Sequence, residues 1–179
     1  MLGSSIDTWA TVGVAVGTIS TVVYALFRDA FVVPRRRPRL DLHLDDHVGD
    51  HARLHVENRP GKDTADDVVV IVTDLRRLGG ADDASPKGLP LMWSGTSPAV
   101  TVASVHPGSR RHVDLVHDES RGLRLALSPP PADGRASLAS GTYEVSVEVR
   151  ARNADAIRYV IPLSTDGKSL RVEMPRRVR

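Results

Sequence analysis

The strongest constraint on this chain is a stretch of 19 residues without a charged side chain, WATVGVAVGTISTVVYALF, at positions 9–27. As an α-helix rising about 1.5 Å per residue it would span roughly 28 Å, close to the thickness of a bilayer's hydrocarbon core. The residues before it contain no Lys or Arg, whereas a cleaved signal peptide requires a positive amino-terminal region. We therefore predict a retained transmembrane helix at 9–27, preceded by a short tail at 1–8.

Basic residues follow this stretch directly, and the segment 28–39 contains Arg28, Arg35, Arg36, Arg37 and Arg39. The positive-inside rule places such a segment in the cytoplasm, which puts the amino terminus outside and the rest of the chain inside. Its two prolines predict an extended, fairly stiff linker. The last four arginines are candidates for contact with anionic lipid headgroups, at about 1 kcal/mol each. The alternative is that they act only as a topology determinant.

Small residues recur at four-residue spacing inside the apolar stretch, at Gly13, Gly17 and Thr21, and GVAVG matches the GxxxG pattern. Small side chains on one helix face let two backbones approach closely. This face is our candidate for lateral association, either with a second copy or with a partner protein. The alternative is that Gly and Thr are simply common in membrane anchors.

The amino-acid composition indicates the kind of source organism and excludes some kinds of site. Of the 24 basic residues only 3 are Lys, and this bias with abundant Ala, Val, Gly and Asp is typical of a high-GC bacterial genome, so we expect a bacterial cell-membrane protein. The chain has no Cys, which excludes disulfides, thiolate metal sites and a cysteine nucleophile.

The charge distribution argues against nucleic-acid binding. Residues 1–40 hold five of the 24 basic and two of the 22 acidic residues, which leaves 19 basic against 20 acidic in the remainder. Aromatic residues make up only 4% of the chain, too few for base-stacking platforms. We expect no nucleic-acid partner, no cofactor and no small-molecule substrate.

From residue 40 onward the hydrophobic pattern has a period of two, which is typical of half-buried strands. Polar turns rich in Gly, Pro, Asp and Ser separate the segments. The alternating segments lie at 39–44, 52–58, 67–75, 99–105, 111–117, 122–128, 142–151, 157–163 and 169–175. This spacing predicts an all-β fold, an antiparallel sandwich over 40–175, with a basic tail at 176–179. The segment 67–75, DVVVIVTDL, contains a continuous apolar run at 68–72, so we expect a strand buried on both faces.

One part of this region, LHVENRPGKDTADDVVVIVTDL, resembles the strand–turn–strand signature of bacterial immunoglobulin-like domains of the cell-adhesion-related type. The resemblance depends on Asn58, Gly61, Ala65 and the run 68–72. Asn58 can bond the backbone of its own turn, and Gly61 can adopt a positive φ. The later GTYEVSVEVRARNADAIRYVIPL is similar to the closing strands of such domains, with Tyr143 as a corner residue. The resemblance implies an immunoglobulin-like sandwich.

The segment HLDDHVGDHARLH, at 43–55, has a histidine at every fourth position. On a helix these would share a face, but leucines alternate on both sides and Gly49 lies in the middle, so we predict a hairpin. A turn centred on Gly49 pairs 44 with 54, 43 with 55 and 42 with 56. His43 and His55 then face each other on the outer face, and with Asp46 from the turn they are candidate ligands for zinc or nickel.

No nucleophile elbow, phosphate-binding loop or zinc-protease motif is present in the sequence, and we expect no enzyme activity. Trp93 is the candidate for an exposed binding aromatic, with core packing as the alternative.

The favoured function is a single-pass, membrane-anchored sandwich that serves as a binding or scaffolding module for another protein, met at a sheet edge or at the small-residue helix face. One alternative is the same architecture facing outward as a cell-surface adhesion module. Another is a metal-dependent function at the hairpin 43–55.

Overall fold

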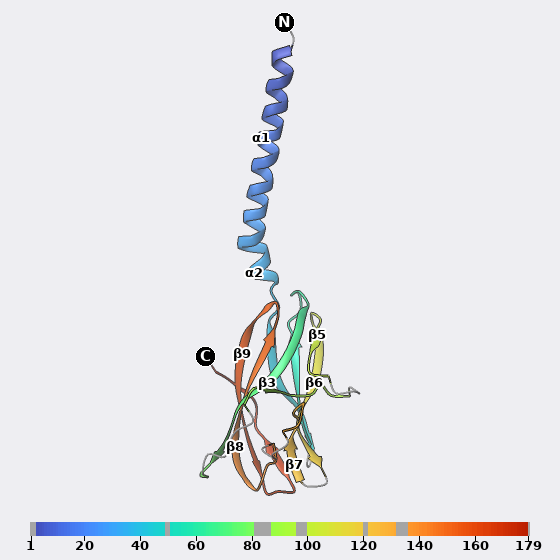
Figure 1. Cartoon of the computed structure of the whole chain (residues 1–179), viewed down its shortest axis with the longest axis vertical. Coiled ribbons are helices and arrows are strands. Elements are labelled where there is room, and N and C mark those ends of the chain that lie inside the picture. Colours follow the sequence, from blue (N-terminus) through green and yellow to red (C-terminus); the bar gives the residue numbers. More distant parts are fainter. Residues whose placement is uncertain are drawn as a thin grey trace. The chain divides into compact units, whose positions relative to one another are not determined.

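The computed structural model describes residues 3–48, 51–80, 87–95, 100–119, 122–131 and 136–178 (Figure 1). Within them, the side chains of residues 3–12, 15, 46–48 and 119 are not described. The chain divides into two compact units, Met1–Arg37 and Pro38–Arg179, and each is considered by itself.

The amino-terminal unit is helical. It comprises α1 (Gly3–Phe27), a π-helical turn η1 (Arg28–Val32) and a short α2 (Val33–Arg36). Its described apolar side chains are exposed on all sides, which is the pattern of a membrane span rather than of an amphipathic helix. The helix is long and apolar enough to cross a membrane, with the qualifying stretch of described residues at Val16–Arg36, further along the chain than the predicted 9–27.

The prediction of an extended linker at 28–39 is wrong for most of its length, because the helix continues to Arg36. Pro34 lies at the start of α2, directly after the π-helical turn η1, so its missing N–H falls where the hydrogen-bond pattern of the helix changes. The helix ends at Arg37, with φ −47° and ψ 137°. Arg37 precedes Pro38, and the proline ring disfavours helical geometry in the residue before it.

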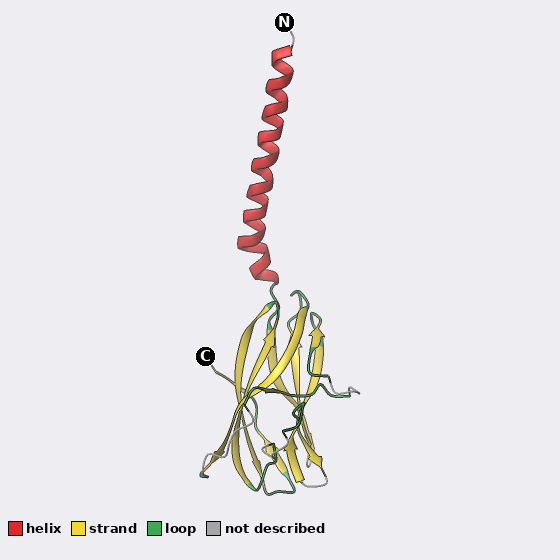
Figure 2. Ribbon diagram, in the orientation of Figure 1, coloured by secondary structure: helices red, strands yellow, loops and turns green. Residues whose placement is uncertain are grey.

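The second unit contains two antiparallel sheets, and strands make up about 55% of the structure (Figure 2). The first sheet has the order β1-β2-β6-β7 and the second has the order β10-β9-β8-β3-β4, with β5 paired to β3 and β11 to β9. The bounds are β1 Leu40–Val48, β2 His51–Asn58, β3 Ala65–Leu78, β4 Leu89–Pro90, β5 Ala103–Val105, β6 Arg110–Glu119, β7 Gly122–Leu125, β8 Gly141–Ala151, β9 Ala154–Thr165, β10 Leu170–Val172 and β11 Arg176–Val178. Each of the nine predicted segments contains a strand.

Both sheets contribute to one hydrophobic core. Leu54 of β2, Val147 of β8 and Ile161 of β9 are fully buried members of it. The alternation of burial along β3 shows one face in the core and one half-exposed, so the expectation of burial on both faces at 67–75 is wrong. The outer face of β3 carries the apolar residues Val69 and Ile71, which pair with β8 and remain half-exposed.

Asn58 ties three separate segments together at the end of β2. Its side chain is fully buried, and Nδ2 donates to Asp63 O at 2.8 Å and to Val105 O at 3.0 Å. Its Oδ1 accepts from Arg39 N at 3.3 Å. The predicted bond from Asn58 to its own turn is confirmed, and the same amide also fixes the start of β1 and the end of β5.

Tyr143 lies near the start of the long strand β8, as expected of a corner residue. Its hydroxyl donates to Ala139 O at 2.8 Å, four residues upstream, which is the bonding pattern of a tyrosine corner. The end of the chain differs from the expectation of a free basic tail at 176–179. Arg176–Val178 forms β11 and pairs with the stretch Arg158–Val160 of β9, because that part of β9 lies beyond the end of β10 and has open backbone groups.

We expect Asn58→Ala to lower the free energy of unfolding by about 3 kcal/mol, because it leaves buried carbonyl groups without donors. Asn153→Ala is the matched control, since Asn153 makes similar bonds to Thr64 and Asp66 but is only half-buried, so that water can replace them. The measurement is urea unfolding of the full chain in detergent, followed by the fluorescence of buried Trp93 in a Trp9→Phe background. Equal losses in the two variants would contradict a special role for Asn58.

Candidate functional site

Three histidines from three adjacent strands form a row on the four-stranded sheet. His43 of β1 is directly opposite His55 of β2, and His55 is directly opposite His112 of β6. The rings of His43 and His55 are stacked with centroids 5.1 Å apart, and the ring of His112 meets that of His55 edge-on at 6.1 Å. The predicted register of the hairpin, with 42, 43 and 44 opposite 56, 55 and 54, is confirmed.

The row lies on the outer face because the neighbouring apolar residues turn inward. Leu42, Leu54 and Val113 flank the three histidines along their strands and are buried in the core. Side chains alternate between the two faces of a strand, so burying these residues sends every histidine of the row outward.

Charged residues form the rows on either side of the histidines. One row pairs Asp41 with Glu57 and Glu57 with Arg110, whose Nε donates to Glu57 Oε2 at 3.1 Å. The other row pairs Arg53 with Asp114, and the distance from Arg53 Nε to Asp114 Oδ1 is 3.3 Å. The outer face is therefore a block of titratable groups with His55 at its centre.

A β-bulge brings a carboxylate to the histidine row. The register of β1 against β2 shifts between Leu44 and Asp46, so Asp45 is an extra residue in the pairing. Its Oδ1 lies 3.5 Å from His55 Nδ1, and its Oδ2 lies 3.2 Å from His112 Nε2. The sequence pattern pointed to Asp46, whose side chain lies outside the described residues.

His55 is buried although it faces outward. Its side chain is only 8% exposed, because the neighbouring side chains of both rows and both strands cover it. This burial lowers the pKa of His55, and the nearby His43 lowers it further, while Asp45 acts in the opposite direction. Its Nδ1 is buried and makes no hydrogen bond with any described residue, since the contact with Asp45 is too long.

Ser94, Asp114 and His51 form a further polar cluster among the described residues. Ser94 Oγ donates to Asp114 Oδ1 at 2.6 Å, and His51 Nε2 lies 3.4 Å from the same oxygen. The carboxylate thus lies between the hydroxyl and the imidazole, whereas a serine nucleophile needs direct contact with its histidine base.

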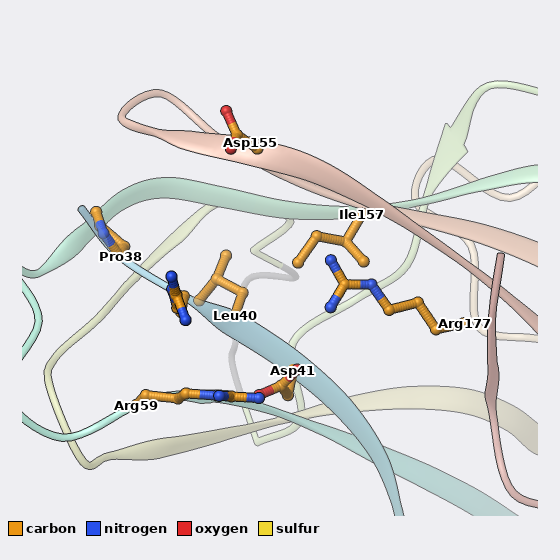
Figure 3. Close-up of a pocket in the computed structure, with 8 residues that line it drawn as sticks. Pro38, Leu40, Asp41, Arg59, Asp155, Ile157 and Arg177 are labelled. Carbon is orange, nitrogen blue, oxygen red and sulfur yellow. The ribbon is translucent and has the colours of Figure 1, made fainter. Parts of the chain in front are cut away.

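A second feature is a cleft of about 310 Å³ at the start of β1 (Figure 3). Figure 3 shows the guanidinium group of Arg177 beside Ile157 at the cleft, and the side chain of Arg59 running alongside Asp41. Arg59 Nε donates to Asp41 Oδ2 at 2.8 Å, so this pair is neutral overall. The lining residues are Pro38, Arg39, Leu40, Asp41, Arg59, Asp155, Ile157 and Arg177.

A third cluster is structural. Glu148 lies on β8 and is 3% exposed, and both Arg150 and Arg158 donate to its carboxylate. These hydrogen bonds lower its pKa against the opposing effect of burial. Both carboxylate oxygens therefore already accept hydrogen bonds from neighbouring guanidinium groups.

The other residues singled out by the sequence are placed as follows. Trp93 is 2% exposed and packs in the core, so the idea of an exposed binding aromatic is wrong. The sequence misplaced it because LPLMWSG forms bridges to residues further along the chain, Leu91 with Leu127 and Trp93 with Val113 of β6. Arg35 and Arg36 lie in α2, Arg37 ends it, and Arg39 lines the cleft; Gly13, Gly17 and Thr21 lie in α1.

Sequence reasoning missed His112, Asp45 and Glu57 as members of this site. The alternation in RHVDLVH does place His112 outward, and that signal was available. The sequence gives no signal that His112 lies beside His55, because that position depends on β6 being the neighbour of β2.

The lowered pKa of His55 has a defined effect on stability. Below the unfolded-state value of 6.5 the unfolded chain binds more protons at this residue than the folded chain, so stability falls as pH drops from 6.5 through the folded pKa. NMR titration of the full chain should give a His55 midpoint below 6.5. His43→Asn should raise that midpoint and Asp45→Asn should lower it further. A wild-type midpoint at or above 6.5 would contradict the burial argument.

Comparisons with known proteins do not assign this arrangement to a family. The chain matches no protein-family model, none of the curated proteins and none of the solved structures. A functional role for these residues therefore has to be inferred from the distances between them, their burial and their charge.

Proposed function

We propose that this protein is a single-pass, membrane-anchored immunoglobulin-like sandwich that serves as a non-catalytic binding module for another protein in a bacterial cell membrane. The observation that carries this proposal is the amino-terminal helix, whose described large apolar side chains lie exposed on every side. No described residue of its own unit buries them.

The energetics favour a lipid environment for this helix. Side chains such as Val14, Ile19 and Leu26 are more than 60% exposed, and burial of each is worth about 1.5–3 kcal/mol. Summed over the helix, leaving them in water would forfeit roughly 10 kcal/mol or more. A helix of 25 residues in α1 alone is about 37 Å long, enough to cross the hydrocarbon core.

Two features of the second unit support the immunoglobulin-like assignment. The hydroxyl of Tyr143 bonds backward to Ala139 as in the tyrosine corner of such domains, and two antiparallel sheets share a single core. Asn58 and Gly61 have the conformations that the resemblance implies, with Gly61 at φ 72°.

The small-residue face of α1 is the favoured route of association. A Cβ added to Gly13 or Gly17 would meet no atom within 4 Å, so a second backbone can approach there. Thr21 Oγ1 donates to Gly17 O at 2.9 Å, which satisfies its hydroxyl inside the helix.

Pairing at the edges of the four-stranded sheet is less favoured, because backbone groups on both of its edge strands are already bonded. On β1, Leu42 N donates to the buried Tyr159 hydroxyl at 3.2 Å, and the bulge at Asp45 interrupts the edge further along. On β7, Leu125 N donates to Ala136 O and Leu123 O accepts from Leu138 N. An added strand would have to displace these bonds.

The orientation is tested with reporters fused to the carboxyl terminus and expressed in a bacterium. If the positive-inside rule holds, a fluorescent-protein fusion is bright and an alkaline phosphatase fusion is inactive. Arg36→Ala/Arg37→Ala should raise phosphatase activity, whereas Arg111→Ala/Arg171→Ala, which removes two exposed arginines from the folded unit, should not. Active phosphatase in the unsubstituted chain would instead favour the outward-facing adhesion module.

Association through α1 is tested by energy transfer between labelled full chains in lipid vesicles. Gly17→Leu should weaken association roughly tenfold, or about 1.4 kcal/mol, because the larger side chain holds the helices apart. Val22→Leu is the matched control, since it lies about 140° around the helix from Gly17. Equal effects of the two substitutions would count against this face.

A further inference from the structure

We propose that His43, His55 and Glu57 bind a divalent transition-metal cation such as Zn²⁺ or Ni²⁺ on the outer face of the four-stranded sheet. Each residue offers one ligand atom, and these atoms all lie within 4.8 Å of one another. This proposal goes beyond the membrane-anchored binding module and does not depend on it, because all three ligands belong to β1 and β2.

The backbone already holds these ligands close to coordination geometry. A tetrahedral zinc ion with bonds of about 2.1 Å separates its ligand atoms by roughly 3.4 Å, so the ligand atoms need to move closer by at most about 1.4 Å. His43 is exposed and Glu57 is half-buried, and both are able to turn toward a buried His55. Cross-strand pairing of His43 with His55 sets the starting distance.

Burial of His55 is the second, independent observation. A buried polar atom normally has a hydrogen-bond partner, and an unsatisfied one costs about 1–3 kcal/mol. His55 Nδ1 is fully buried, has no hydrogen-bond partner among the described residues and points to a neighbourhood that contains the carboxylate of Asp45. An imidazole held in place by its neighbours is preorganised to offer a nitrogen to a cation.

The ligand types select the class of metal. Imidazole nitrogen suits zinc, nickel and copper, whereas magnesium and calcium prefer sites made of oxygen ligands. Two imidazoles with one carboxylate leave a fourth position open on a zinc ion. A water molecule can take that fourth position.

The competing interactions at the site are weak. Arg110 donates to Glu57, but its side chain is 60% exposed, and surface ion pairs of this kind are worth under about 1 kcal/mol. Arg110 can therefore move into solvent when a cation takes its place beside Glu57.

The test is isothermal titration of the untagged full chain in detergent with ZnCl₂, NiCl₂ and MgCl₂. We expect 1:1 binding of Zn²⁺ and Ni²⁺ and no binding of Mg²⁺. Even second-shell residues change metal affinity by 10–100-fold, so His43→Ala and Glu57→Gln should each weaken zinc binding more than tenfold. His106→Ala is the matched control, because His106 lies in a turn and contacts Thr64 instead.

A second measurement guards against a variant that fails to fold. Visible absorption of bound Co²⁺ reports its ligand geometry, and the exposed His43 is replaceable without opening the core. Loss of the tetrahedral Co²⁺ bands in His43→Ala, with circular dichroism unchanged, would support the proposal. It would be overturned by the absence of saturable heat with Zn²⁺ and Ni²⁺, by equal binding of Mg²⁺, or by equal affinities in His43→Ala and His106→Ala. Weakening by Asp45→Asn but not by Glu57→Gln would overturn the assignment of Glu57.

Discussion

The pairing register of β2 with its two neighbours, β1 and β6, holds the core and the candidate site in a single arrangement. With this register Leu54 and Val56 point into the core and His55 points outward between His43 and His112. A slip of one residue would turn imidazoles and carboxylates into the core and leucines into solvent, at a cost of several kcal/mol. Asn58 pins the register, because its amide binds three segments at the end of β2.

The same register concentrates titratable groups on one outer face. His55 becomes buried there without entering the core, because the residues beside it on three strands are long or ring-shaped. Ion pairs of Arg53 with Asp114 and of Arg110 with Glu57 balance the charge around it. The imidazole nitrogens and carboxylate oxygens of this face are therefore carried by paired strands, and the proposed metal site would rest on that backbone.

How far the sequence predicts this arrangement depends on the range of the interactions. Alternation of leucines around Gly49 predicts the pairing of His43 with His55, and the structure confirms it. The bulge at Asp45 is not predicted, because one extra residue does not disturb the alternation of leucines on either side of it. The bulge only changes which carboxylate lies beside the imidazole ring of His55. The burial of Trp93 is also missed, since it depends on contact with β6 from a distant part of the chain.

The sequence by itself determined the elements: one apolar helix, a β-rich remainder, the hairpin register and the outward direction of its histidines. These are local properties, set by hydrophobic period and by turn residues. Only the tertiary structure decided that β6 lies beside β2, that His112 joins the histidine row and that β11 closes part of β9. The packing of the whole core determines which strands far apart in the sequence become neighbours. The alternation along one strand does not indicate which strand pairs with it.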